Sequence, residues 1–151
     1  MLTKQEAAAE VRAAKFRLGL SWAQLAEAVG EPLAWTVSAL LGQQPMTSEQ
    51  AANAVAKLRL GEDVQAALQL QPTRGALDAA VPADPTIYRF YEIVQVYGPT
   101  IKELIHEEFG DGIMSAINFG FDVKRVHDPD GDRVVVTLDG KFLPYQWRHH
   151  P

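Results

Sequence analysis

The chain changes its hydrophobic pattern once, and this change constrains the fold more than any other feature. Residues 1 to about 70 are rich in alanine and leucine at helical spacing, whereas the pattern after residue 112 is that of strands. Between them, residues 71–86 hold three of the nine prolines and interrupt the periodicity. The sequence therefore predicts an α+β protein with a helical domain over 1–72, a linker over 73–85 and a second domain over 86–151.

The first domain is expected to consist of five short helices. Thr3 and Glu6 have the spacing of a capping box, and Gly30 has the position of a residue that ends a helix. Thr47 or Ser48 is expected to cap the fourth helix. Short connections between such helices predict a small orthogonal bundle, helix-turn-helix-like and of the lambda-repressor type. The expected helices cover residues 4–18, 22–29, 32–41, 48–60 and 62–70.

Helix-turn-helix spacing suggests DNA binding, but the charges oppose it. No lysine or arginine lies between Arg17 and Lys57, where Glu27, Glu31 and Glu49 occur instead. A protein that neutralises phosphates needs cations on that surface. The net charge of −5 also argues mildly against binding nucleic acid or an anionic membrane. We therefore expect this bundle to serve packing or assembly.

The second domain is expected to begin with two helices and continue as strands. The helices cover residues 86–97 and 100–109, with a break at Gly98-Pro99. Strands are expected over 113–126, 133–140 and 141–145, with turns at the Asp-Gly pairs 111-112, 130-131 and 139-140. Such a sheet is too small to cover both its faces, so its core should be completed against another subunit. This is the pattern of a dimerisation domain.

Two patterns resemble metal sites, and both have simpler explanations. Positions 1, 3, 5 and 12 of a calcium loop hold aspartates, but position 6, which requires glycine, holds Arg133, and strands are expected on both sides. A hairpin turn explains these aspartates better. The histidines do not cluster as zinc ligands would. The aspartates are Asp128, Asp130, Asp132 and Asp139, and the histidines are His106, His127, His149 and His150.

Composition excludes further classes. The chain has no cysteine, which excludes disulfides, thiolate metal sites and a cysteine nucleophile. No signal-peptide pattern is found at the beginning and no uninterrupted apolar run is long enough to span a membrane. A cytoplasmic protein is therefore expected.

The segment YRFYEIVQVYG, residues 88–98, places two charges in aromatic and β-branched surroundings. Arg89 and Glu92 are neighbours at i,i+3 on a helix, so a structural ion pair is one interpretation. The other is a site for a small planar oxyanion, which the donor fork of arginine suits. In that case Glu92 orients the arginine or moves protons.

Ser115 lies in the apolar segment IMSAINF, beside Asn118. With no histidine positioned to activate it, this serine is expected to donate a hydrogen bond to an anion, not to act as a nucleophile.

Three segments together resemble the cyanase (cyanate hydratase, or cyanate lyase) family. They are DPTIYRFYEIVQVYG at 84–98, HEEFGDGIMSAINF at 106–119 and RVVVTLDGKFLP at 133–144. In the first half, SWAQLAEAVG and ALLGQQPM are also similar to this family. The resemblance covers nearly the whole chain, in order and without large gaps.

The resemblance implies an enzyme without metal or cofactor that converts cyanate and its co-substrate bicarbonate into carbamate and carbon dioxide. Its catalytic residues would be Arg89, Glu92 and Ser115. It also implies a homodecamer of five dimers, with intertwined C-terminal sheets and active sites where several subunits meet. Two departures from the family are Pro99, where a small polar residue is expected, and the basic tail YQWRHHP. A helix-turn-helix DNA-binding protein and a non-catalytic assembly protein remain as alternatives.

Overall fold

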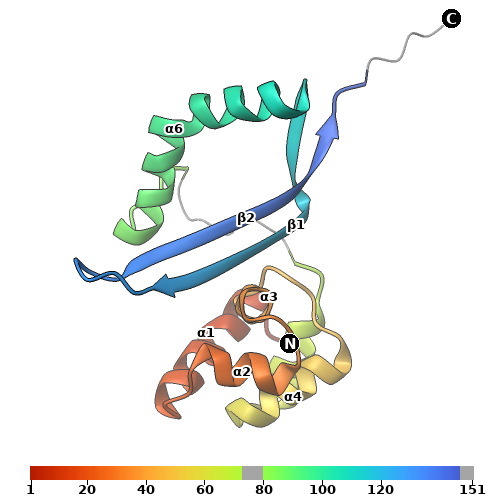
Figure 1. The fold of residues 1–151 in the computed structure, drawn as a ribbon. Coiled ribbons are helices and arrows are strands. Elements are labelled where there is room, and N and C mark those ends of the chain that lie inside the picture. The colour runs from red at the N-terminus through yellow and green to blue at the C-terminus, as the bar shows by residue number, and fades with distance from the viewer. Residues whose placement is uncertain (73–79, 147–151) are drawn as a thin grey trace, which may run out of the picture. The chain divides into compact units, whose positions relative to one another are not determined.

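The computed structural model describes residues 1–72 and 80–146, which belong to two compact units, Met1–Ala76 and Leu77–Pro151 (Figure 1). The predicted domain limits of 1–72, 73–85 and 86–151 stay a prediction, and most of the expected linker lies outside the described residues.

The first unit contains the five expected helices. Capping boxes begin three of them, formed by Thr3 with Glu6, Ser21 with Gln24 and Thr47 with Gln50. Thr47, not Ser48, is therefore the cap of the fourth helix. The helices are α1 (Lys4–Arg17), α2 (Trp22–Val29), α3 (Leu33–Leu40), α4 (Ser48–Leu58) and α5 (Glu62–Gln69).

All five helices contribute to one core in this unit. Leu25, Leu40, Leu58 and Leu68 are fully buried at its centre, with alanines filling the places where helices approach closely. Lys4 adds a polar tie, because its Nζ donates to the carbonyl oxygens of Gln44 (3.0 Å) and Leu68 (2.9 Å). Burial lowers the pKa of Lys4, as desolvation disfavours the charged form. The helical unit thus completes its own core.

The second unit consists of one helix and one long hairpin. The helix α6 (Pro85–Phe109) is capped by Asp84, whose carboxylate accepts from the backbone amides of Thr86 and Ile87. The strands β1 (Gly112–Val126) and β2 (Arg133–Pro144) pair antiparallel. The predicted α+β class is therefore confirmed.

The expected break at Gly98-Pro99 is wrong, because α6 continues through both residues. Figure 1 shows that α6 is bent partway along its length. A proline removes one backbone hydrogen bond from a helix and bends it, but strong turns on both sides can continue the helix.

The expected turn at Asp139-Gly140 is also wrong, because β2 runs through it as one strand. Gly140 instead pairs with Phe119 on β1, next to an irregularity of the ladder. A glycine inside a strand often indicates a bulge or a close approach of two backbones. Both are found at Gly140, which lies next to the bulge and close to the backbone of β1. The turn at Asp130-Gly131 is confirmed, with the Gly131 amide donating to the Asp128 carbonyl at 2.9 Å.

The second unit has almost no core of its own. Between residues 80 and 146, Pro99 apart, the buried residues are Pro82, Gly112 and Ser115. Large apolar side chains on α6 and the hairpin are exposed instead, among them Val94 (62%), Leu104 (62%), Ile117 (97%) and Val134 (76%). An exposed apolar surface of this extent is typical of a subunit interface.

Within the described residues, no helix is both long enough and apolar enough to cross a bilayer.

Candidate functional site

Arg89 and Glu92 lie one turn apart in the first half of α6 and form an ion pair. The distance from Arg89 Nη1 to Glu92 Oε2 is 2.8 Å. The arginine also lies over the ring of Tyr88, with Cζ 5.3 Å from the ring centroid. These contacts place the guanidinium beside Tyr88 and Glu92 on the helix surface.

Both members of this pair are exposed in the single chain. The side chain of Arg89 is 62% accessible and that of Glu92 is 48% accessible. Nearby apolar side chains are exposed too, including Phe90 (49%) and Ile93 (46%). Within one chain, the two charges therefore face no interior. A pair at i,i+3 in water contributes only a few tenths of a kcal/mol, so stability alone does not explain its surroundings.

Ser115 has the opposite environment, because it is the one buried polar side chain between residues 80 and 146. It begins an irregular part of β1. Met114 pairs with Phe142 and Phe119 pairs with Gly140, so the four residues 115–118 lie opposite Lys141 alone. The strand thus carries an irregular bulge of several residues, named here the Ser115 bulge, over residues 115–118.

The bulge determines what the Ser115 hydroxyl can do. Its Oγ accepts hydrogen bonds from the backbone amides of Ile117 (3.0 Å) and Asn118 (2.9 Å). A serine hydroxyl has two lone pairs and one proton, so both acceptor positions are in use. The proton is left to donate, and no hydrogen bond from it is found within the described residues. This geometry agrees with an anion donor and opposes a nucleophile, whose lone pair must be free.

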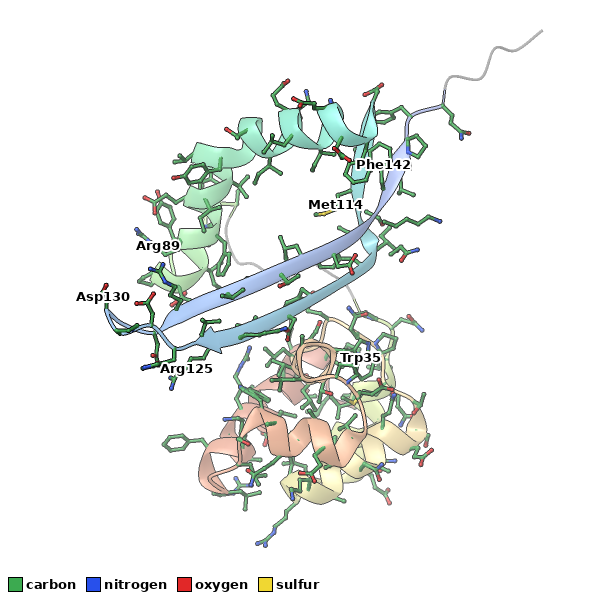
Figure 2. The ribbon with its side chains drawn as sticks, in the orientation of Figure 1. Trp35, Arg89, Met114, Arg125, Asp130 and Phe142 are labelled. Atoms are coloured by element: carbon green, nitrogen blue, oxygen red, sulfur yellow. The ribbon has the colours of Figure 1, made fainter. Side chains whose placement is uncertain are left out.

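One chain does not bring these three residues together. No hydrogen bond or ion pair joins Ser115 to Arg89 or Glu92 within the described part of the chain. Figure 2 shows Arg89 well separated from Met114, the chain neighbour of Ser115. If the three act in one reaction, the arginine and the serine must come from different chains.

Two of the four aspartates of the supposed calcium loop, Asp128 and Asp132, accept hydrogen bonds from neighbouring groups. Asp128 accepts from Arg133 Nε (2.6 Å) and from the Asp130 amide (3.0 Å), and these two donors hold the pKa of Asp128 below its usual value. Asp132 accepts from His127 Nδ1 at 3.0 Å. Asp139 lies within β2. The explanation by a hairpin turn is confirmed, since strands flank the loop on both sides.

The two histidines that the structure describes, His106 and His127, lie at opposite ends of β1. His106 is half-buried near the end of α6, where its Nε2 lies 3.2 Å from the Gly112 carbonyl and therefore donates to it. His149 and His150 belong to the tail beyond Gln146, outside the described residues. No group of three or more metal-ligating side chains is found in the part of the chain that the structure describes.

The sequence alone did not reveal the Ser115 bulge or the two backbone amides that bind Ser115. The available signal was Gly140, a glycine between two strand-like segments. We interpreted it as turn chemistry because Asp-Gly pairs favour hairpin turns. The better explanation is that the bulge of β1 leaves no room for a side chain at residue 140 of β2. This can be seen only once the register of the two strands is known.

Comparison with known proteins covers nearly the whole chain. Residues 4–72 match the model of the N-terminal domain of cyanate hydratase, and residues 79–147 match that of the C-terminal domain of cyanate lyase. A protein named cyanate hydratase from Mycolicibacterium vanbaalenii is 62% identical over 146 residues, which is 97% of this chain and 95% of that protein. Another from Thiobacillus denitrificans is 53% identical, over 96% of this chain and 99% of that one.

A solved structure agrees. The crystal structure of cyanase from T. urticae superposes with a TM-score of 0.80 at 36% identity, covering 93% of this chain and 99% of that chain. Two domain models match in order, and the relatives are more than half identical along almost their whole length. The chain therefore belongs to the cyanate lyase family.

Proposed function

We propose that this protein is a cyanate hydratase that uses bicarbonate as its second substrate. An oxygen of bicarbonate attacks the carbon of cyanate, and the bicarbonate carbon then leaves as carbon dioxide. The transferred oxygen stays on carbamate, whose nitrogen takes the bicarbonate proton and one from solvent. Carbamate takes up a further proton and breaks down to ammonia and a second carbon dioxide.

One observation carries this proposal, namely the 62% identity with a cyanate hydratase along 97% of the chain. The alternative of a helix-turn-helix DNA-binding protein has no such support. A regulator would also need cations on α2 and α3, and neither helix contains a lysine or arginine. We therefore expect no salt-sensitive binding to random duplex DNA at physiological ionic strength. An electrophoretic shift that weakens steeply as salt rises would contradict this. A non-catalytic assembly protein would not explain why the two lone pairs of the buried Ser115 hydroxyl are engaged by amides while its proton is left to donate.

We assign the chemistry to Arg89, Glu92 and Ser115. Two monoanions must meet, so the site has to offset their repulsion and stabilise the charge that develops between them. The guanidinium of Arg89 supplies a positive charge and paired donors. Glu92 holds that guanidinium in place through the 2.8 Å ion pair. The Ser115 hydroxyl donates its remaining proton to an anionic oxygen.

The site as proposed needs no metal and no organic cofactor. Bicarbonate brings the nucleophilic oxygen, so no side chain and no metal-bound water has to supply one. A dry environment strengthens such a site, because charges interact more strongly away from water. Arg89 is 62% exposed in one chain, so this environment has to come from other subunits.

We further propose a ring of ten subunits, formed by five dimers whose hairpins intertwine. The exposed apolar surfaces of α6, β1 and β2 support it, because these elements have no core within one chain. Each active site then receives Arg89 and Glu92 from one chain and Ser115 from another.

The test is the release of ammonia from cyanate by the purified protein, measured with and without added bicarbonate. We expect release that saturates with both anions and continues after dialysis against a chelator. Absence of release at any bicarbonate concentration would contradict the function. Release without bicarbonate, in buffer freed of carbon dioxide, would contradict the role of the second substrate.

A further inference from the structure

The Ser115 bulge lies against a glycine of the opposite strand. Gly140 pairs with Phe119, the first regular residue after the bulge, and the chain then passes Lys141 before pairing resumes at Phe142. Figure 2 shows Met114 and Phe142 at the end of the hairpin that meets the end of α6. Phe142 stacks there on Phe109 of α6, with ring centroids 5.2 Å apart. The bulge is therefore next to a point where α6 and both strands are in contact.

Space at Gly140 is already filled by the bulge. A Cβ placed on Gly140 would lie 2.5 Å from the carbonyl oxygen of Ser115, and closer still to Cγ of Met114. Carbon and oxygen atoms that are not bonded do not approach so closely, so one of them would have to move. The methionine side chain can turn away, since it has several rotatable bonds. The carbonyl belongs to the backbone of Ser115 and moves only if the serine moves.

Gly120 provides the contrast within the same hairpin. It pairs with Asp139, the residue before Gly140, yet a Cβ on Gly120 would meet no atom within 4 Å. Neither Gly120 nor Gly140 has a positive φ. Glycine is therefore needed at position 140 because a side chain there would collide with the backbone of Ser115, and not because of its backbone conformation.

We propose that Gly140 is a positioning residue for the Ser115 hydroxyl. Its missing side chain lets the Ser115 carbonyl lie against β2. This contact fixes the bulge in which the amides of Ile117 and Asn118 occupy both lone pairs of Ser115 Oγ. An alanine at 140 displaces the carbonyl and therefore redirects the hydroxyl proton. The inference rests on the proposed function in one respect, that this proton is donated to a reacting anion.

Gly140→Ala tests the inference, with Gly120→Ala as the matched control. Both add one methyl group to the same hairpin. If Gly140→Ala assembles normally, we expect its kcat to fall on the order of a hundredfold, because a displacement of about 1 Å at a reacting centre can cost that much in rate. Gly120→Ala should keep the wild-type kcat. Equal kcat values for the wild type and an assembled Gly140→Ala would overturn the inference.

The double variant Ser115→Ala/Gly140→Ala shows whether residue 140 acts through the serine. If it does, the double variant has the kcat of Ser115→Ala alone, because the hydroxyl is already absent. A general structural role would multiply the two losses, as independent sites do. Multiplied losses would therefore also overturn the inference.

Hydrogen exchange supplies a measurement that does not depend on activity. Mass spectrometry of peptides spanning the bulge should show faster exchange of the Ile117 and Asn118 amides in Gly140→Ala than in wild type or Gly120→Ala. If Gly140→Ala exchanges faster but Ser115→Ala keeps the wild-type kcat, then Gly140 shapes the bulge and the proposed role of Ser115 is wrong. An inactive Ser115→Ala with a fully active Gly140→Ala would leave the proposed function standing and reject the inference.

A second variant tests the inference in case Gly140→Ala does not assemble. Met114→Ala/Gly140→Ala removes the side-chain contact and leaves only the contact with the Ser115 carbonyl. We expect it to assemble and still lose activity, whereas Met114→Ala alone stays active. Recovery of activity in the double variant would show that Met114 was the important contact. Failure of both Gly140 variants to assemble would show that Gly140 is needed for the fold instead, which also rejects the inference.

Discussion

At the scale of single residues, the account depends on which hydrogen-bonding capacity each side chain has left. Ser115 Oγ has both lone pairs engaged by backbone amides, so its chemistry is reduced to one proton. Arg89 keeps several donors beyond the one that Glu92 accepts. A hydroxyl proton and a guanidinium fork are donors of the kind that anions bind, and neither is a base or a nucleophile. This explains how the site can act without a cysteine or a serine–histidine pair.

Arg89→Lys separates a surface ion pair from an anion site. Lysine keeps the charge and loses the planar fork. If the arginine only pairs with Glu92, the change should cost under about 1 kcal/mol and leave activity unaltered. If it binds a reacting anion, kcat should fall by on the order of a hundredfold or more. Arg125→Lys, at an exposed arginine of the hairpin, is the control and should stay fully active.

Ser115→Ala is expected to lose activity to a similar extent, because the donated proton is gone. Ser115→Thr keeps a hydroxyl and is the companion variant. Alanine also leaves the amides of Ile117 and Asn118 without their acceptor, at a cost of about 1–3 kcal/mol in the bulge. Steady-state kinetics therefore has to be paired with light scattering. An assembled Ser115→Ala protein with near-normal turnover would remove the serine from the site.

At the scale of elements, the helical unit follows local rules closely. The capping box of Thr3 with Glu6 is predicted from the sequence, and the five helices begin and end within a few residues of their predicted limits. Local agreement of this kind means that each helix is specified by its own residues. The cap of α4 is the sharpest example, because Thr47 and Ser48 are adjacent and only Thr47 accepts from the Gln50 amide.

Thr47→Ala and Ser48→Ala form a matched pair for this element. Thr47→Ala should destabilise the protein by about 1 kcal/mol, the usual cost of losing an N-cap side chain. Ser48→Ala should change stability by only a few tenths, since Ser48 is exposed and lies inside the helix. Urea denaturation at one fixed protein concentration compares them. Equal midpoints for the two variants would contradict the assignment of Thr47 as the cap.

The elements of the second unit were harder to predict, for physical reasons. The sequence predicts the positions of α6, β1 and β2, but it also predicts a break at Gly98-Pro99 and a turn at Asp139-Gly140, and the structure has neither. Both errors came from local rules, which state what a residue favours and not what its neighbours enforce. The residues Arg89, Glu92 and Ser115 were named from the sequence by resemblance and by their surroundings. The bulge that restricts Ser115 was not, because register depends on contacts between distant residues.

At the scale of the whole molecule, the two units differ in how they bury apolar surface. The helical unit has a closed core, whereas α6 and the hairpin leave large side chains such as Val94, Leu104 and Ile117 exposed. An exposed surface of this kind carries a cost that only association removes. In the proposed assembly the chains that cover α6 would also enclose Arg89, so the same contacts would serve both assembly and the active site.

The proposed assembly predicts a large closed oligomer in solution. Light scattering coupled to size exclusion should give a single mass near ten times that of the 16.6 kDa chain. If dilution dissociates the oligomer, the monomers that form should be inactive. A monodisperse, active monomer would refute both the assembly and the shared site.

A site for two monoanions should also accept one small dianion that spans both positions. Oxalate and malonate are therefore expected to inhibit in competition with the substrates. They should also raise the melting temperature, because a ligand that binds the native state stabilises it by mass action. Arg89→Lys should show a smaller rise than the wild type. No shift at millimolar dianion would count against a pocket for two anions.

The central claim is that Arg89 and Ser115 of one active site belong to different chains, and subunit complementation tests it most directly. Arg89→Lys and Ser115→Ala chains with different affinity tags are expressed together, and oligomers that contain both are isolated over two columns. Each variant expressed alone is the control and should be nearly inactive. Random mixing places an intact arginine and an intact serine together in roughly a quarter of the sites, so mixed oligomers should regain about that share of wild-type activity. If both residues came from the same chain, every site would carry one defect, and mixed oligomers as inactive as the parents would contradict the account.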